Sequence, residues 1–373
     1  MTPRAMLFTG AGQPLQSLPQ STVPPTGAEV RVRMLCCTLC RSDLATYTGQ
    51  RIEPTPTILG HEVVGEIESF GPAANRSDAT GQVASIGDRI TWAIVAACGS
   101  CFYCERDLPQ KCERGVKYGH HRTSPDHPNG GGLADAITLV PGTEWFRVPD
   151  NLSTPVASLA NCAGATVAAV LEAAGPVAGQ TVLIYGAGLL GLLACAMIAA
   201  HGARAVIAVD PDRGSRERAI AFGATHTLDP NDPAFDSDLR EIVGPRGGDV
   251  ALELAGRAET VGACLGRVRT GGVVVLAGTV SPTPAVSLDP QQFVRRMLTL
   301  RGIHNYQSRH LRAALDFLAG PGKVYPLESL IAETFPLDRV VDAFSAAQHH
   351  TGRRVAVTSS SPPEVPGPSR DSL

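Results

Sequence analysis

The sequence predicts a two-part α/β protein, in which a β-rich N-terminal part is followed by a doubly wound parallel sheet. Residues 1–150 contain short runs of valine and isoleucine separated by glycine and proline, as in β-strands joined by turns. From residue 155 strand-like and helix-like segments alternate, and this alternation favours a parallel sheet covered by helices. The 373 residues are enough for two hydrophobic cores, and 43% hydrophobic with 18% charged residues is ordinary for a globular protein.

The individual elements follow from short stretches of the sequence. The first part holds four strand-like runs, "AEVRVRMLCC", "VVGEIESFG", "DRITWAIV" and "ADAITLV", with a polar loop expected over 71–88. The second part begins with the helix-like "PVASLANCAGATVAAVLEAAG" and alternates through "TVLIY", "LLGLLACAMIAAHG", "AVIAVD", "DRGSRERAIAFG", "DVALELAG", "ETVGACLGRV" and "GGVVVLAG". After residue 300 the chain is mixed in character up to the strand-like "RRVAVT", and the proline- and serine-rich residues 358–373 are expected to be a disordered tail.

A glycine-rich turn after the strand "TVLIY" indicates a dinucleotide site. Gly186, Gly188 and Gly191 form a G-x-G-x-x-G pattern, and Asp210 ends the next strand. The first two glycines let a pyrophosphate approach the helix N-terminus, and the third lets helix and strand pack closely. Asp210 would accept hydrogen bonds from the adenosine ribose and repel a 2′-phosphate, so NAD is expected rather than NADP. The alternative is a buried or membrane-spanning apolar helix with incidental glycines.

The net charge and the N-terminal sequence indicate which partners and which cellular compartment to expect. The net charge is −3 and there is no run of lysine or arginine, so neither nucleic acid nor a membrane is expected as a partner. Residues 181–200 are uncharged over about the length of a membrane span, but their glycine pattern favours a globular fold. Ten cysteines without an N-terminal export signal indicate a reducing compartment, and the protein is expected to be cytoplasmic.

Four of the ten cysteines form one motif in "CGSCFYCERDLPQKC". Cys98, Cys101, Cys104 and Cys112 have the spacing C-x2-C-x2-C-x7-C, which suits one tetrahedral ion held by four thiolates. Four protein ligands leave no open position, so the site would be structural. An iron–sulfur cluster is the alternative, although the charged, turn-rich loop favours zinc.

A second candidate metal set is spread along the chain. Cys40 lies in "CRSD", His61 and Glu62 lie in "GHE", and Cys162 lies in "NCAGAT". One imidazole and two thiolates would bind zinc and leave a fourth place for water or substrate. Spacing alone does not establish that these residues converge, and a single cysteine on an apolar helix is more often core than ligand.

Together, and in this order, the motifs resemble the medium-chain, zinc-dependent alcohol dehydrogenase family. The similarity extends over residues 4–357 and includes "CRSD", "GHEVVGEIESFG", "GDR", the four-cysteine lobe, "NCAGATVAAV", the glycine turn and "VD". It implies a GroES-like catalytic domain (1–151 and 300–357) and an NAD-binding Rossmann domain (152–299). It also implies an alcohol or carbonyl substrate, NAD, two Zn²⁺ per chain, and a homodimer or homotetramer joined through the cofactor-domain sheets.

The resemblance assigns metal-site roles to particular residues. It implies that the catalytic zinc is held by Cys40, His61 and Cys162. Glu62 would lie close to this metal, and Asp43 would orient the imidazole of His61.

Other residues take roles toward cofactor and substrate. Ser42 stands where the family keeps a hydroxyl that accepts the substrate proton, and Thr166 would pack near the nicotinamide. Arg41, together with Arg353 or Arg354, would contact the cofactor pyrophosphate.

One position departs from the family pattern. Liver-type members end their proton relay on a histidine five residues after the first zinc cysteine, and this chain has Ala45 there. The proton would instead leave through ribose hydroxyls, water or a group such as Tyr47.

Some phrases are similar to a subgroup proposed to act in phosphonate metabolism, namely "TPTILGHEVVGEI", "NCAGATVAAVLEAAG" and "RRMLTLRGIHNY". A hydroxyalkylphosphonate substrate would need cationic groups near the zinc cleft. The candidates are Arg51, His120, His121 and His304, followed by Arg309 and His310. For each of them, a solvated surface charge or a loop histidine is the plainer interpretation.

Two other functions are weighed against this one. A zinc-free quinone or enoyl reductase of the same superfamily would lack the cysteine lobe and the Cys/His/Cys set. A non-catalytic dinucleotide-binding member would show a degraded metal site or glycine turn, and neither is degraded here.

Overall fold

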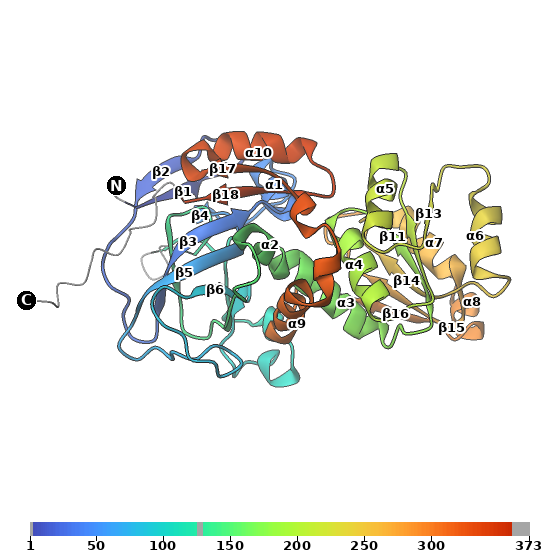
Figure 1. The fold of residues 1–373 in the computed structure, drawn as a ribbon, viewed down its shortest axis with the longest axis horizontal. Helices are drawn as coiled ribbons and strands as arrows, with labels where there is room; N and C mark the ends of the chain where they lie inside the picture. The colour runs from blue at the N-terminus through green and yellow to red at the C-terminus, as the bar shows by residue number, and fades with distance from the viewer. Residues whose placement is uncertain (1–2, 125–129, 360–373) are drawn as a thin grey trace, which may run out of the picture.

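The computed structural model describes residues 3–124 and 130–359, whose strands form two large sheets with helices between and around them (Figure 1). A seven-stranded sheet with two small sheets lies in one part of the molecule, and a six-stranded parallel sheet lies in the other. The predicted fold class, a β-rich domain with a doubly wound parallel-sheet domain, is confirmed. Residues 360–373, nearly all of the expected tail, lie outside the described residues.

The seven-stranded sheet combines segments from both ends of the described chain. Its order is β10-β6-β5-β3-β18-β17, with β9 also paired to β3. The late strand β18 therefore lies beside the early strand β3, with Ala356 opposite Thr38. The strands are β3 (Val30–Thr38), β5 (Glu62–Phe70), β6 (Arg89–Trp92), β9 (Ala136–Leu139), β10 (Trp145–Arg147), β17 (Ile331–Pro336) and β18 (Arg354–Thr358). The small sheets consist of β1 (Arg4–Phe8), β2 (Gln16–Pro19) and β4 (Thr57–Ile58), and of β7 (Val95–Ala96) and β8 (Val116–Lys117).

The parallel sheet has the order β13-β12-β11-β14-β15-β16. The chain reverses its direction of winding between β11 and β14, and ligands of such sheets bind where the order reverses, at the carboxyl ends of the strands. Both faces are buried: Val182 and Ile184 of β11 pack on one side, and Leu183 and Tyr185 pack on the other. The strands are β11 (Thr181–Tyr185), β12 (Ala205–Val209), β13 (His226–Leu228), β14 (Gly248–Glu253), β15 (Val268–Leu276) and β16 (Thr299–Gly302).

One expected domain boundary needs correction. The sequence placed the end of the cofactor domain at residue 299, but all four residues of β16 pair with β15, from Thr299 opposite Val273 to Gly302 opposite Leu276. The parallel sheet therefore extends to Gly302. The short, partly exposed β16 lacks the continuous apolar run that marks the other strands of this sheet.

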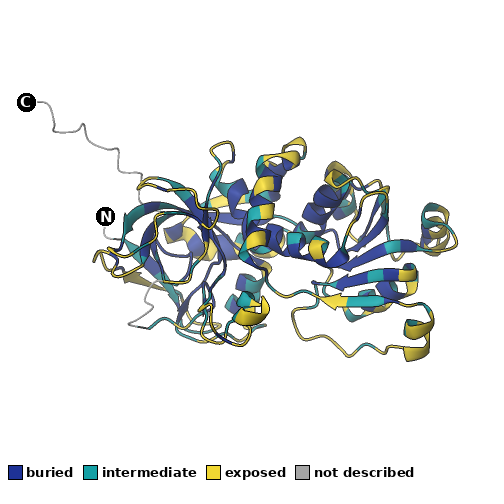
Figure 2. Cartoon of the chain, turned by 90° about the horizontal axis from the view of Figure 1, so that it is seen from below, coloured by how far each residue is buried: buried dark blue, intermediate teal, exposed yellow. Residues whose placement is uncertain are grey.

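Helices fill the space between the two sheets and cover their outer faces (Figure 1). Figure 2 shows that the buried residues gather in the sheets and in the helices between them. The α-helices are α1 (Arg41–Tyr47), α2 (Thr154–Ser158), α3 (Thr166–Ala174), α4 (Leu189–Ala200), α5 (Arg213–Ala221), α6 (Phe235–Val243), α7 (Ala258–Arg267), α8 (Pro290–Arg295), α9 (Ser308–Ala319) and α10 (Val340–His349). Within the described ranges, none of these helices has the length and apolar character needed to cross a membrane.

Candidate active site

Side chains from three segments meet at one end of β3 and β5. One ligand atom each from Cys40, His61, Glu62 and Cys162 lies within 4.8 Å of the others, and the Sγ atoms of Cys40 and Cys162 are 3.9 Å apart. The pairing of β3 with β5 places Thr38 opposite Glu62, which brings Cys40, two residues past β3, close to His61, the residue before β5. The structure thus brings these residues together, which their spacing in the sequence alone did not establish.

The position of Cys162 depends on a distorted turn, the π-helical segment Ala160–Ala165. Asn161 has ψ −142°, which interrupts the helical backbone directly before the cysteine. The Asn161 side chain donates to the carbonyl of Val63 at 3.1 Å and accepts from Thr91 Oγ1 at 2.6 Å. Because Val63 and Thr91 belong to β5 and β6, these bonds hold the turn against the seven-stranded sheet. Asn161 was not singled out from the sequence, although a buried amide inside an apolar run was the available signal.

Asp43 fixes the orientation of His61. Its Oδ1 lies 3.1 Å from His61 Nδ1 and accepts from the Gly60 amide at 3.1 Å, while its Oδ2 accepts from the Cys40 amide at 2.9 Å. Because Nδ1 is held by this carboxylate, Nε2 is the nitrogen that faces the cluster. Ser42 Oγ lies 3.4 Å from Nε2, so the expected hydroxyl stands beside the expected ligand.

A buried ion pair between Arg354 and Glu62 also contacts the cluster. Arg354 donates to both carboxylate oxygens of Glu62, each at 2.7 Å, and to Cys40 Sγ at 3.4 Å. Thr38 Oγ1 donates a third hydrogen bond to Glu62 at 2.7 Å. The sequence placed Arg354 at the cofactor pyrophosphate, whereas the contacts in the structure are with Glu62 and Cys40. A pyrophosphate contact by Arg354 therefore stays a prediction.

The donor atoms of the three candidate ligands suit a metal ion, which would displace the protons that the raised pKa values favour on His61 and Cys162. The contact with Cys162 lowers the pKa of the Cys40 thiol well below its usual value and raises that of Cys162. Burial opposes protonation of His61, but Asp43 and Cys40 outweigh it and raise the pKa of His61 to about 10. Two sulfurs and one imidazole nitrogen are a ligand set of catalytic zinc sites that keep an open fourth position. These residues therefore fit a zinc ion.

The four-cysteine lobe is compact. One ligand atom from each of Cys98, Cys101, Cys104 and Cys112 lies within 4.8 Å of the others, and Cys101 Sγ is 3.5 Å from Cys104 Sγ and 3.9 Å from Cys112 Sγ. A tetrahedron of thiolates around zinc, with Zn–S of about 2.3 Å, has edges of about 3.8 Å. The separations therefore fit one ion rather than a multi-iron cluster between the thiolates. All ten cysteines lie in the described residues and are free of disulfides.

The glycine turn joins β11 to α4 as expected. Gly186 has φ +98°, a conformation that side chains disfavour, and a Cβ on Gly191 would lie 1.9 Å from the Gly186 carbonyl oxygen. Gly188 is the N-cap of α4, and a Cβ added there would meet nothing within 4 Å. Asp210, directly after β12, accepts from the Ala187 amide at 2.7 Å, which places its carboxylate at the turn. The arrangement leaves the α4 N-terminus available to a pyrophosphate.

The remaining residues expected at the cofactor or in the proton path lie on separate elements. Thr166 is buried and begins α3, four residues after Cys162. Arg41 is exposed at the start of α1. Arg353 is partly buried and contacts His350 at 3.1 Å. Tyr47, offered as a proton exit, stacks on Phe344 of α10 with ring centroids 4.1 Å apart.

Some of the expected phosphonate-binding groups lie near the cluster. The His120 ring is 4.8 Å from the His61 ring, and Glu53 pairs with both Arg51 and His120. Burial lowers the pKa of His120 and of His304 to about 4. Both imidazoles are therefore uncharged at neutral pH, which corrects their expected role as cations.

The other expected groups have contacts outside the cluster. Arg309 and His310 of α9 both pair with Glu172 of α3, at 2.8 Å and 3.1 Å, and Arg309 also pairs with Asp107. For His121 the backbone carbonyl accepts from Thr57 Oγ1 at 2.7 Å.

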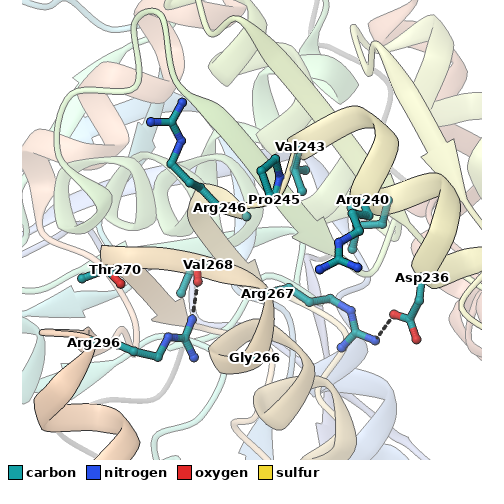
Figure 3. Close-up of a pocket in the computed structure, with 13 residues that line it drawn as sticks. Asp236, Arg240, Val243, Pro245, Arg246, Gly266, Arg267, Val268, Thr270 and Arg296 are labelled. Carbon is teal, nitrogen blue, oxygen red and sulfur yellow. Dashed lines mark hydrogen bonds and ion pairs between the residues drawn. The ribbon is translucent and has the colours of Figure 1, made fainter.

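A hollow of about 480 Å³ opens at the amino ends of β14 and β15 (Figure 3). Arg267 on its wall pairs with Asp236 at 2.8 Å and lies over the Phe235 ring. Arg296 donates to the carbonyls of Leu265 and Val268. The hollow is thus at the edge of the sheet opposite the glycine turn.

Two family models match the chain. Residues 26–150 match the alcohol dehydrogenase GroES-like domain, and residues 190–320 match the zinc-binding dehydrogenase domain. L-threonine 3-dehydrogenase of Pyrococcus furiosus is 31% identical over 295 residues, which cover 78% of each chain.

Solved structures agree over nearly the whole chain. An alcohol dehydrogenase from Thermotoga maritima aligns with a TM-score of 0.89 at 25% identity, covering 96% of this chain and 100% of the other. A structure from Sinorhizobium meliloti 1021, assigned as a zinc-binding dehydrogenase and bound to NADP, aligns with a TM-score of 0.82 at 27% identity. It covers 96% of this chain and 99% of the other.

Proposed function

The chain belongs to the zinc-dependent medium-chain alcohol dehydrogenase family, and we propose that it transfers a hydride between a primary or secondary alcohol and NAD. The observation that carries the proposal is the convergence of Cys40, His61 and Cys162, with Ser42 Oγ 3.4 Å from the imidazole. Family membership supports an oxidoreductase acting on CH–OH groups that uses zinc and a nicotinamide cofactor. The identity of the cofactor, of the substrate and of the individual ligands is our proposal.

Different residues of the chain are proposed to bind the metal ion, transfer the proton and orient the imidazole ligand. A zinc ion held by Cys40, His61 and Cys162 would lower the pKa of an alcohol hydroxyl and polarise a carbonyl. Ser42 is placed to accept the hydroxyl proton and pass it outward, while Asp43 keeps the His61 ring in one orientation. The four-cysteine lobe would hold a second zinc ion and take no part in the chemistry.

NAD is the cofactor we propose for this chain. The glycine turn presents the α4 N-terminus to the pyrophosphate, and the Asp210 carboxylate at the turn would accept hydrogen bonds from the ribose hydroxyls. The same carboxylate would repel a 2′-phosphate. The Sinorhizobium structure holds NADP, so cofactor choice needs to be measured on this chain.

We also propose a hydroxyalkylphosphonate as a substrate and a homodimer or homotetramer as the assembly. Arg51 supports an anionic substrate, because its partner Glu53 also pairs with His120, whose ring lies 4.8 Å from the ring of His61. The edge strand β16 and the exposed Val280, Val294 and Met297 support pairing through the cofactor-domain sheets. Molar mass by light scattering tests the assembly.

Zinc content tests the catalytic proposal. Protein purified without chelator should carry two zinc ions per chain, Cys40→Ser should carry one, and Cys36→Ala should keep two. Cys36 is the matched control because it is a buried cysteine of β3 outside the cluster. One zinc in the wild type, unchanged in Cys40→Ser, would mean that only the lobe is filled and would favour the zinc-free reductase.

A further inference from the structure

Positive charge gathers beside the metal-ligand cluster on two stretches of the chain, one around residue 51 and one over residues 111–117. Lys111 directly precedes the last cysteine of the lobe, Lys117 ends β8, and Arg51 follows α1. The chain contains 32 lysine and arginine residues, and only Lys111, Lys117 and Lys323 among them are lysines. Two of the three lysines therefore lie in this one region of a chain that otherwise uses arginine.

Lys111 is held in place by the chain that follows β16. Its Nζ donates a hydrogen bond to Nδ1 of His304. Burial lowers the pKa of His304 to about 4, with Lys111, Lys117 and Arg51 acting in the same direction. An uncharged imidazole can accept this hydrogen bond at neutral pH. His304 therefore positions the ammonium group of Lys111 without adding a charge.

Lys117 is partly buried and, among the described residues, its side chain has neither a hydrogen bond nor an ion pair. Burial lowers its pKa, and so does Arg51, whereas Glu53 and Cys162 raise it. The Lys117 carbonyl accepts from the His120 amide at 3.1 Å, and the His120 ring lies 4.8 Å from the ring of His61, one of the proposed zinc ligands. Keeping a partly buried charge without a partner costs free energy, which a bound anion would offset.

The charge balance favours an anion with two negative charges. Within the described part of the chain, Glu53 is the carboxylate that pairs with this group, through Arg51, and it also lies 3.3 Å from His120. Because Glu53 pairs with Arg51, the ammonium groups of the exposed Lys111 and the partly buried Lys117 are the two charges that no carboxylate among the described residues pairs with. The metal cluster does not supply the missing negative charge, because two thiolates would balance a divalent ion and Asp43 is fully buried behind His61.

We propose that Arg51, Lys111 and Lys117 bind a doubly negative oxyanion carried by the alcohol substrate, such as the phosphonate of 2-hydroxyethylphosphonate. The inference rests on the proposed function, because the anion is bound while the carbinol lies at the zinc ligands. A phosphate monoester offers the same charge and tetrahedral shape, whereas a carboxylate is planar and carries one charge. Ammonium and guanidinium groups bind such oxyanions through charge-assisted hydrogen bonds.

The test compares Lys117→Met with the control Lys323→Met, since Lys323 is exposed on a separate turn. For each zinc-loaded enzyme, kcat/KM is measured for 2-hydroxyethylphosphonate and for 1-propanol. The ratio of the two should fall about 10- to 100-fold in Lys117→Met, mainly through KM, and keep its wild-type value in Lys323→Met. 2-Hydroxyethyl phosphate and 3-hydroxypropanoate distinguish a phosphonate from a phosphate ester and from a carboxylate.

A second readout does not depend on turnover. Calorimetry should show methylphosphonate binding to the wild-type holoenzyme and to Lys323→Met, and this binding should be lost in Lys117→Met. If wild type oxidises 1-propanol while Lys117→Met leaves both the ratio and methylphosphonate binding unchanged, the anion site is overturned and the dehydrogenase function stands. If the two-zinc protein oxidises none of these alcohols, the proposed function fails, and methylphosphonate binding that depends on Lys117 would still support the anion site.

Discussion

Replacing Arg354 with methionine should destabilise the catalytic domain strongly. Arg354 is 4% exposed and Glu62 is fully buried, and the two form a bidentate ion pair between β18 and β5. Methionine fills a similar volume but leaves the Glu62 carboxylate without its counter-charge. Thr38 Oγ1 remains as its hydrogen-bond donor.

The expected loss is about 3–5 kcal/mol, the usual cost of removing one partner from a buried ion pair. Burial raises the pKa of Glu62, and Arg354 works against this rise. Without Arg354 the pKa rises further, so the carboxyl can escape part of the penalty by taking up a proton. A carboxyl with a raised pKa destabilises the fold only when it is ionised. The loss should therefore be smaller at pH 5 than at pH 8.

Urea unfolding followed by tryptophan fluorescence measures this loss in the relevant domain. The two tryptophans, Trp92 and Trp145, are neighbours in β6 and β10 of the seven-stranded sheet, so their signal reports on that sheet. Arg312→Met is the control, because Arg312 makes an exposed i,i+4 pair with Asp316 that should contribute about 0.5 kcal/mol or less.

Two outcomes would contradict this reasoning. One is a loss below about 1 kcal/mol in Arg354→Met, which would mean that the pair is hydrated. The other is an equal loss when Arg354→Met is made in a Glu62→Gln background, because the neutral amide no longer needs a counter-charge.

Three further predictions concern the cofactor and the proton. Gly191→Ala places a Cβ 1.9 Å from the Gly186 carbonyl oxygen, so the turn must shift. The affinity for NADH, measured by fluorescence titration, should fall at least about tenfold. An unchanged affinity would show that the turn does not hold the pyrophosphate. Ser42→Ala should lower kcat about 10²- to 10⁴-fold at pH 7 with the zinc content unchanged, and full turnover across pH 6–9 would exclude its relay role. Asp210→Ser should reduce the NAD-to-NADP ratio of kcat/KM about tenfold or more, and an unchanged ratio would remove Asp210 from cofactor selection.

Features defined by residues close together in the sequence could be predicted. The glycine turn and the four-cysteine lobe each lie within one short stretch, and the structure has both where the spacing placed them. Local spacing carries this information because ligands and turns are built from neighbouring residues. The end of the parallel sheet was missed because β16 has four residues, none of them buried, and is recognisable only by its pairing with β15.

Contacts between distant segments could not be predicted from local patterns, and only the family resemblance brought Cys40, His61 and Cys162 together. Arg354 and Glu62 are 292 positions apart, and nothing local marks either as the partner of the other. Lys111 stands singly in the lobe and Lys117 follows it in β8, and only the fold brings Lys111 to His304, 193 positions away. The phosphonate resemblance included Arg51, which the proposed site keeps, but it also included His120 and His304, whose burial removes the charge that such a role requires.

The place of β18 in its sheet determines when the metal-binding domain can be completed during synthesis. β11 to β16 lie in one uninterrupted stretch, so the parallel sheet can form as soon as residue 302 has left the ribosome. The seven-stranded sheet must wait, because β18 fills the position between β3 and β17. Until β18 arrives, β3 has an open edge and Glu62 lacks Arg354. Until then the proposed zinc-binding cysteines stand in an unfinished domain, and β18 both closes the sheet and neutralises the carboxylate.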